Sequence, residues 1–334
     1  MKLYSNKTLQ FVFFCLSAVL CCLWAAQLTA AKGQVVEPNG LQSPGQDTIE
    51  SAPSEPNGLS QPDQQTEEEN DSFTPKLSTL VVINEAYERI FTPDLITDDG
   101  LVRYATLRRL RNDLVTAMRE LKTLHPAVLM KMSKEEKIAF WLNTYNACTL
   151  QLVIDNYPIQ PKWYMILYPD NSIMQLDKPW TRHFFWISQE QYTLQEIRQE
   201  LLLDRYKDPR LCFALSYAAR GGAALRNEPY RPQTLDSQLN DQVKKFLSRP
   251  DGLRLDKNSN ILYLSNVFAL QENKKTFLES EWAKVKKFRQ RKDEERAWLN
   301  FIVQWLPEED IRYLETAPFT IKFLEYDWHL NELR

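Results

Sequence analysis

Apolar side chains recur every three to four residues over positions 133–158, a pattern that predicts a long helix. The segment SKEEKIAFWLNTYNACTLQLVIDNYP opens on Ser133 with Glu136 three residues later, the two halves of a capping box. Further apolar residues leave this helix little polar surface, so we expect it at the centre of the domain, ended by Pro158. Its apolar stripe comprises Ile138, Trp141, Leu142, Tyr145, Cys148 and Leu152.

Other segments carry helical or strand-like patterns on both sides of this helix. The predicted helices are 77–91, 100–124, 234–249 and 276–306, the last as one long helix or two short ones. The predicted strands are 211–217, a hairpin of 253–256 with 261–265, and a closing strand with a tail in 317–331. This order predicts a single domain of the α+β class, with helices packed around a small, mostly antiparallel sheet.

The first 31 residues differ from the rest and predict an export signal. Lys2 and Lys7 give a positively charged start, an apolar stretch follows at 11–26, and small residues follow at 29–31. The alternative is an uncleaved anchor, because that stretch approaches the ~20 residues that span a bilayer. A cleaved signal predicts that the body of the protein is exported and is either periplasmic or secreted. An uncleaved anchor predicts a membrane-anchored protein that contacts the membrane only through residues 11–28.

Residues 32–76 predict a disordered acidic linker rich in proline, serine and glutamine. They show almost no apolar periodicity, so burial cannot offset the entropy lost on ordering them. The pentapeptide EPNGL occurs at 37–41 and again at 55–59, which indicates low complexity. The globular domain is therefore expected over 77–334.

Composition narrows the range of functions. The net charge of the chain is −3, which gives no reason to expect a nucleic-acid partner. The sequence lacks the short motifs of nucleotide, dinucleotide and zinc-protease sites, and its histidines, His125, His183 and His329, are widely spaced. No metal and no cofactor is therefore predicted. His183 and His329 lie beside aromatic residues as candidate acid–base groups, but neither has a nucleophilic partner near it in the sequence.

Two asparagines interrupt the apolar surface of the long predicted helix. Asn143 and Asn146 lie about one turn apart, on either side of Tyr145. Buried amides must be hydrogen-bonded. These two residues therefore either contact a ligand or hold the backbone of a neighbouring loop.

A pair of glycines, Gly221 and Gly222, lies between Arg220 and the dipeptide Arg226–Asn227. Glycine tolerates positive φ, so successive N–H groups at this point would form an anion nest, and the arginines favour a carboxylate or a phosphate. The alternative is a tight turn after a strand, with the arginines solvated or paired with Glu228.

Two cysteines, Cys148 and Cys212, remain after the N-terminal segment. An oxidising compartment would allow a disulfide between them, but their apolar neighbours favour two buried, unpaired thiols. The basic run at 284–292 is accompanied by acidic residues, so we expect a solvated helix face in preference to a lipid contact.

Three segments, in order, resemble the family of the domain of unknown function numbered 547 over most of 77–334. Residues 137–158 are similar to its first hallmark, F-W-[IL]-N-x-Y-N-x-x-x-[IL]. Residues 208–247 resemble its second hallmark, and LEYDWHLN at 324–331 resembles its closing D-W-x-L-N. The matched positions imply scaffold and pocket roles more than catalysis. The candidate binding residues are the matched Asn143, Tyr145, Asn146, Arg226, Asn227, Tyr230 and Asp327, together with Tyr217.

The chain departs from the family pattern at positions suited to chemistry. The second hallmark usually reads R-[IV]-H-F-A-[IL]-x-C-A-S-x-x-C-P-x-L, and Cys212, Tyr217 and Gly222 stand at its histidine and its two cysteines. Arg198 stands at the acid of an upstream S-L-x-x-I-E. A thiol, a histidine and a carboxylate are the parts of a Cys–His hydrolase or transferase site. The resemblance therefore implies a member that has lost any such chemistry.

Three functions are compatible with this sequence. The preferred one is an exported, non-catalytic domain that binds a cell-envelope component or a protein partner. The second is an enzyme of hydrolase or transferase type with a relocated, non-thiol site that uses His329 or His183 with Asp327. The third is a structural interaction protein whose acidic linker matters more than its pocket.

Overall fold

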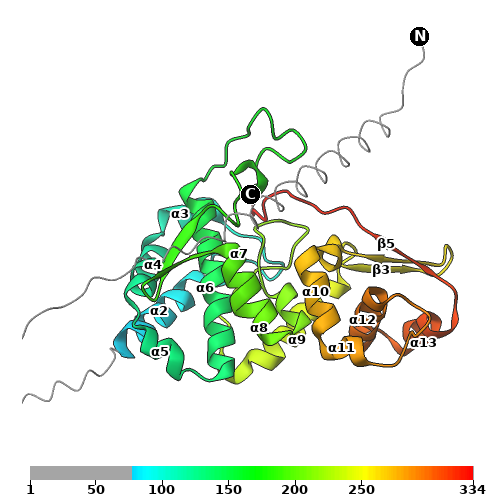
Figure 1. Cartoon of the computed structure of the whole chain (residues 1–334). Helices are drawn as coiled ribbons and strands as arrows, with labels where there is room; N and C mark the ends of the chain where they lie inside the picture. Colours follow the sequence, from blue (N-terminus) through cyan, green and yellow to red (C-terminus); the bar gives the residue numbers. More distant parts are fainter. Residues whose placement is uncertain (1–76, 334) are drawn as a thin grey trace, which may run out of the picture. The chain divides into compact units, whose positions relative to one another are not determined.

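The computed structural model describes residues 77–333 (Figure 1), so the predicted export signal and linker lie outside the described residues. A central helix lies between a group of helices that precede it and those that follow (Figure 1). None of the described helices is long and apolar enough to cross a membrane. The first elements are α2 (Leu77–Ile90), α3 (Tyr104–Arg109), α4 (Asn112–Thr123), α5 (Pro126–Lys131) and α6 (Lys134–Asp155).

Helix α6 is the predicted central helix. The Ser133 hydroxyl accepts from Glu136 N at 3.1 Å, and the Glu136 carboxylate accepts from Ser133 N at 2.7 Å, which confirms the capping box. Every residue from Ile138 to Leu150 is buried. The polar residues within this stretch therefore lie inside the protein, where each polar atom needs a partner.

The segment after α6 forms a hairpin and a helical run. Strands β1 (Phe184–Ile187) and β2 (Glu190–Thr193) pair antiparallel beside α4, a hairpin that the sequence analysis did not predict. The chain then continues through α7 (Leu194–Glu196), η2 (Ile197–Leu203), α8 (Asp204–Tyr206) and η3 (Pro209–Phe213). The predicted strand at 211–217 is wrong, because a short buried apolar run fits a buried helical turn as well as a strand.

A second small sheet forms from the C-terminal part of the described chain. The predicted hairpin is confirmed as β3 (Leu253–Asp256) and β4 (Ile261–Leu264), and β5 (Thr320–Phe323) joins β4 in parallel. In this register Leu262 lies opposite both Leu255 and Ile321. The α+β class and the mostly antiparallel pairing are confirmed, but the strands form two sheets instead of one.

Helices between these strands enclose an aromatic core. The Phe213 ring stacks on Phe301 with centroids 5.8 Å apart. The predicted helix at 276–306 is divided, and most of the basic run, from 285 to 292, lies in irregular chain instead of on a helix face. The elements are η1 (Ile173–Gln175), η4 (Pro232–Thr234), α9 (Leu235–Ser248), η5 (Asn266–Ala269), α10 (Gln271–Glu279), α11 (Glu281–Lys284), α12 (Asp293–Ile302), η6 (Val303–Trp305) and α13 (Glu308–Thr316).

The connection from α6 to β1 projects from the domain as a large loop (Figure 1). Trp163, Ile166 and Leu167 on it are 87%, 81% and 84% exposed. Buried Gln175 holds its backbone: the side-chain carbonyl accepts from Lys162 N at 2.8 Å, and the amide nitrogen donates to three loop carbonyl oxygens at 3.2–3.3 Å. The loop therefore has a defined path although its apolar side chains face solvent.

We predict that Gln175→Ala loosens this loop without unfolding the domain. The change leaves Lys162 N and Tyr168 O without the partner that the amide supplies, whereas Met165 O and Pro169 O keep backbone donors. The contacts of the main core remain. The expected result is faster amide exchange and faster proteolysis within 162–169. Gln233→Ala, at an exposed position outside the loop, serves as the control and should leave both rates unchanged.

Candidate binding site

Asn143 and Asn146 each bind the backbone of a loop with both polar atoms of the amide. The Asn143 side chain accepts from Tyr230 N at 2.8 Å and donates to Tyr230 O at 2.9 Å. The Asn146 side chain accepts from Ser216 N at 2.9 Å and donates to Ala214 O at 3.0 Å. Their side-chain atoms thus hold loop backbone, one of the two roles that the sequence left open.

The C-terminal segment passes along the loop that contains the two glycines. Arg220 N donates to His329 O at 2.9 Å, and Asn331 N donates to Ala218 O at 3.3 Å. The buried Asn331 side chain also accepts from the Tyr104 hydroxyl at 2.7 Å. The three segments that resemble family hallmarks therefore meet in space.

Close packing explains the glycine pair. A Cβ atom at Gly221 would lie 2.6 Å from Asp327 N, and one at Gly222 would lie 2.8 Å from the Tyr326 hydroxyl. Neither glycine has positive φ, and their N–H groups donate to Asp327 O and Ala219 O. Of the two alternatives, the structure therefore excludes the anion nest, because these N–H groups are already bound within the protein.

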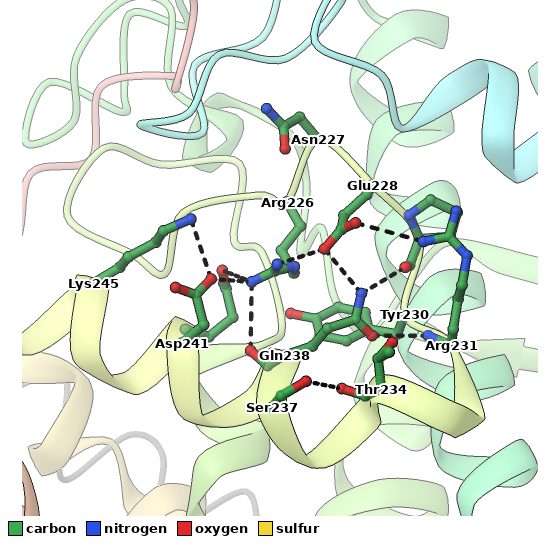
Figure 2. A network of polar contacts seen from close by, with 12 residues as sticks. Arg226, Asn227, Glu228, Tyr230, Arg231, Thr234, Ser237, Gln238, Asp241 and Lys245 are labelled. Atoms are coloured by element: carbon green, nitrogen blue, oxygen red, sulfur yellow. Dashed lines mark hydrogen bonds and ion pairs between the residues drawn. The ribbon is translucent and has the colours of Figure 1, made fainter.

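Arg226 joins the loop after the glycines to helix α9 (Figure 2). Its guanidinium donates to the Glu228 carboxylate at 2.6 Å and to the Asp241 carboxylate at 2.5 Å. Partial burial opposes ionisation of both acids, but hydrogen bonds from Arg226 and from a second neighbour, Gln238 or Lys245, together with nearby positive charges, outweigh it and lower the pKa of Glu228 and of Asp241. The guanidinium therefore binds the protein's own carboxylates. This agrees with the alternative in which Arg226 pairs with Glu228.

The remaining candidates do not gather in a single cavity. Asn227 donates to Asp98 at 2.8 Å near the surface, and Asp327 accepts from His329 Nδ1 at 2.6 Å, also near the surface. Asn143 and Tyr230 line a cavity of about 320 Å³. Whether any candidate residue touches a ligand stays a prediction.

A larger groove, of about 440 Å³, lies beside the glycine loop, and the sequence analysis missed several of its residues. Arg249 holds the loop by donating to Gly222 O at 2.8 Å and to Arg220 O at 2.7 Å. Arg220 and Lys245 bring further positive charge, balanced in part by Asp251 and two aspartates at 98 and 99. No local motif marks Arg249, because it follows α9 as an ordinary charged residue near a helix end.

The four positions that depart from the family pattern form one cluster. The Arg198 guanidinium carbon lies 5.4 Å from the centre of the Tyr217 ring. A Cβ at Gly222 would lie 3.6 Å from Tyr217 Cβ, and Arg198 interacts electrostatically with Cys212. Residues from η2, η3 and the glycine loop are thus brought to one place inside the domain.

The sequence model of a family described as a protein of unknown function, DUF547, matches residues 129–247. Within this range the chain belongs to the DUF547 family. The matched range contains α6, the departing positions of the second hallmark and all but the last residue of α9, whereas the closing motif lies beyond it. No curated protein and no solved structure matches the chain.

Both cysteines of the DUF547 domain are buried and unpaired, as the sequence favoured. Burial raises the pKa of the Cys212 thiol to about 12, although Arg198 opposes the rise, and burial likewise raises the pKa of Cys148. The thiolate is the nucleophilic form of cysteine. Cys212 is therefore held in its unreactive form at neutral pH.

We predict that alkylation of the folded chain spares Cys148 and Cys212. With the pKa of Cys212 at about 12, roughly one molecule in ten thousand carries its thiolate at about pH 8. Peptide mapping after iodoacetamide treatment should show both residues labelled in urea and neither in the native protein. Equal labelling of Cys212 in the two conditions would show that its thiol is accessible and ionised.

Proposed function

We propose that this DUF547 protein is an exported, non-catalytic domain that binds a cell-envelope component or a protein partner. One observation carries the proposal: the departing positions cluster around Arg198 and Tyr217, where the family pattern has an acid and a cysteine. A Cys–His mechanism needs an ionised thiol and a histidine that accepts its proton. Cys212 and Arg198 supply neither group.

Two surface features support a binding role. The groove beside Gly222 offers about 440 Å³ lined by six charged side chains and by small apolar residues. The projecting loop presents Trp163, Ile166 and Leu167 to solvent, and clustered exposed apolar side chains are typical of interaction surfaces. A charged groove suits a polar envelope component, and an apolar loop suits a partner with an apolar face.

The test is a thermal-unfolding screen of the full chain against sugars, muropeptides, phosphates, lipids and short peptides. Saturating ligand at ~100 times its Kd adds about 2.7 kcal/mol, which raises the Tm by a few degrees for a domain of this size. Arg220→Ala removes a positive charge from the groove, whereas Arg108→Ala removes one from an exposed site outside it. Arg226 is unsuitable as the test position, because its loss breaks internal ion pairs.

The expected result is a shift that persists in Arg108→Ala and disappears in Arg220→Ala. The non-catalytic part of the proposal has a separate test, because the enzyme alternative uses His329 with Asp327, whose side chains lie 2.6 Å apart near the surface. Hydrolysis or group transfer by the purified chain, abolished by His329→Ala or by His183→Ala, would refute it.

A further inference from the structure

Three further aromatic side chains, Tyr145, Trp180 and Tyr326, surround Arg198 and Tyr217, and we call these five side chains the Arg198–Tyr217 cluster. Each of them has a buried donor atom without a hydrogen-bond partner among the described residues. These atoms are the hydroxyls of Tyr145, Tyr217 and Tyr326, the indole nitrogen of Trp180 and the Nε of Arg198. The Trp180 indole also lies close enough to the Tyr145 hydroxyl to affect its pKa, although the pair lacks hydrogen-bond geometry. The Trp180 and Tyr217 rings lie 5.9 Å apart, and Tyr145, Tyr217, Tyr326 and Arg198 interact electrostatically. Orphaned donors are rare in protein interiors, and here they gather in one place.

The cluster also carries a positive charge that the protein compensates only in part. Arg198 is almost completely buried, and its Nη2 donates to the neutral Asn273 side chain at 2.7 Å. Its one carboxylate partner within 4 Å, on Glu272, lies 3.7 Å from Nη1, beyond hydrogen-bond distance. Burying a charge without close partners costs several kcal/mol.

We propose that this cluster is a binding site for a small monovalent anion, either a free halide or a carboxylate group. An anion accepts hydrogen bonds from phenol, indole and guanidinium donors at once, and it neutralises the buried guanidinium. Burial raises the pKa of all three tyrosines, although Arg198 opposes the rise, so their hydroxyls stay protonated as donors at neutral pH.

Gly222 lies between this cluster and the groove. It lines the groove, and a Cβ at this position would lie 2.8 Å from the Tyr326 hydroxyl. The glycine therefore allows the groove wall to pack directly against the Tyr326 hydroxyl of the cluster. The anion site does not depend on what the groove binds, so it stands or fails separately from the proposed function.

The experiment measures unfolding of the full chain at constant ionic strength. The sodium salt of HEPES, whose anionic group is attached to a bulky zwitterion, is replaced stepwise by sodium chloride or by sodium formate. The expected result is a saturable rise in Tm with one or both small anions. Tyr217→Phe should raise the apparent Kd about tenfold or more, because a hydrogen bond to a charged group contributes about 1.5–3 kcal/mol.

Two comparisons make the test decisive. Tyr164→Phe, at an exposed position on the projecting loop, should keep the wild-type Kd. In the HEPES salt alone, Tyr217→Phe should be at least as stable as the wild type, because it removes a hydroxyl that no protein group binds. Tyr145→Phe repeats the test at a second hydroxyl if Tyr217→Phe does not fold.

The two salts distinguish the sources of the anion. A response to chloride indicates a free halide site, and a response to formate alone indicates recognition of a carboxylate. An equal Tm in all three salts, or the same Kd in Tyr217→Phe as in the wild type, would overturn the proposal and leave ordered water as the partner of these donors.

Discussion

Asn146→Ala is expected to lower the free energy of unfolding by about 2–5 kcal/mol. The asparagine side chain binds Ser216 N and Ala214 O. Alanine would leave Ser216 N buried without a partner and Ala214 O with only the long contact from the Tyr230 hydroxyl at 3.5 Å. Each buried unsatisfied group costs about 1–3 kcal/mol. Urea unfolding should therefore show a lower midpoint at an unchanged m-value.

A matched variant separates this effect from a general cost of asparagine replacement. Asn84 is exposed on α2, and Asn84→Ala should stay within about 0.5 kcal/mol of the wild type. Asn143→Ala, which removes the equivalent pair of bonds to Tyr230, should behave like Asn146→Ala. A loss below 1 kcal/mol in both buried variants would show that the loops find other hydrogen-bond partners.

The central helix could be predicted from sequence because its signals are local. The Ser133–Glu136 capping box and the apolar period lie within one segment, and they located α6 and its two buried asparagines. Sequence could not decide what those amides bind. Their partners lie 68 to 87 residues away, and no local pattern encodes a contact at that distance.

The same limit explains the errors. The apolar run at 211–217 has no strand beside it and forms a short helical turn followed by irregular chain. Its apolar pattern indicates burial, and this conformation buries the side chains as well as a strand would. The glycine pair suggested a backbone conformation that only glycine adopts. In the structure a side chain is excluded instead because the C-terminal segment passes close to Gly221. The convergence of Arg198 with Tyr217 also depends on tertiary contacts, although the family comparison marked each position separately.

Arg226→Ala is expected to cost about 2–3 kcal/mol at neutral pH. Hydrogen bonds between charged groups contribute about 1.5–3 kcal/mol each, but Glu228 and Asp241 are 41% and 39% exposed, so solvent screens part of this energy. The loss should appear as a lower urea midpoint. Arg226→Lys, which keeps the charge without the planar fork, should lose an intermediate amount.

The cost of Arg226→Ala is also expected to depend on pH. Arg226 lowers the pKa of Glu228 and Asp241 in the folded protein, so its contribution is complete above the ordinary carboxylate pKa values, near 4.5 and 3.8. The contribution is lost as the pH falls through the lower folded-state values. The stability difference between wild type and Arg226→Ala should therefore shrink between about pH 6 and pH 2.

This pH dependence distinguishes ion pairing from packing. The Arg226 guanidinium also lies 6.0 Å from the centre of the Tyr230 ring, a contact that does not require ionised carboxylates. If the two acids are responsible for the stabilisation, the difference narrows in acid, and the double variant Glu228→Gln, Asp241→Asn abolishes most of its pH dependence. A difference that stays constant from neutral to acidic pH would instead assign the role of Arg226 to its packing over Tyr230.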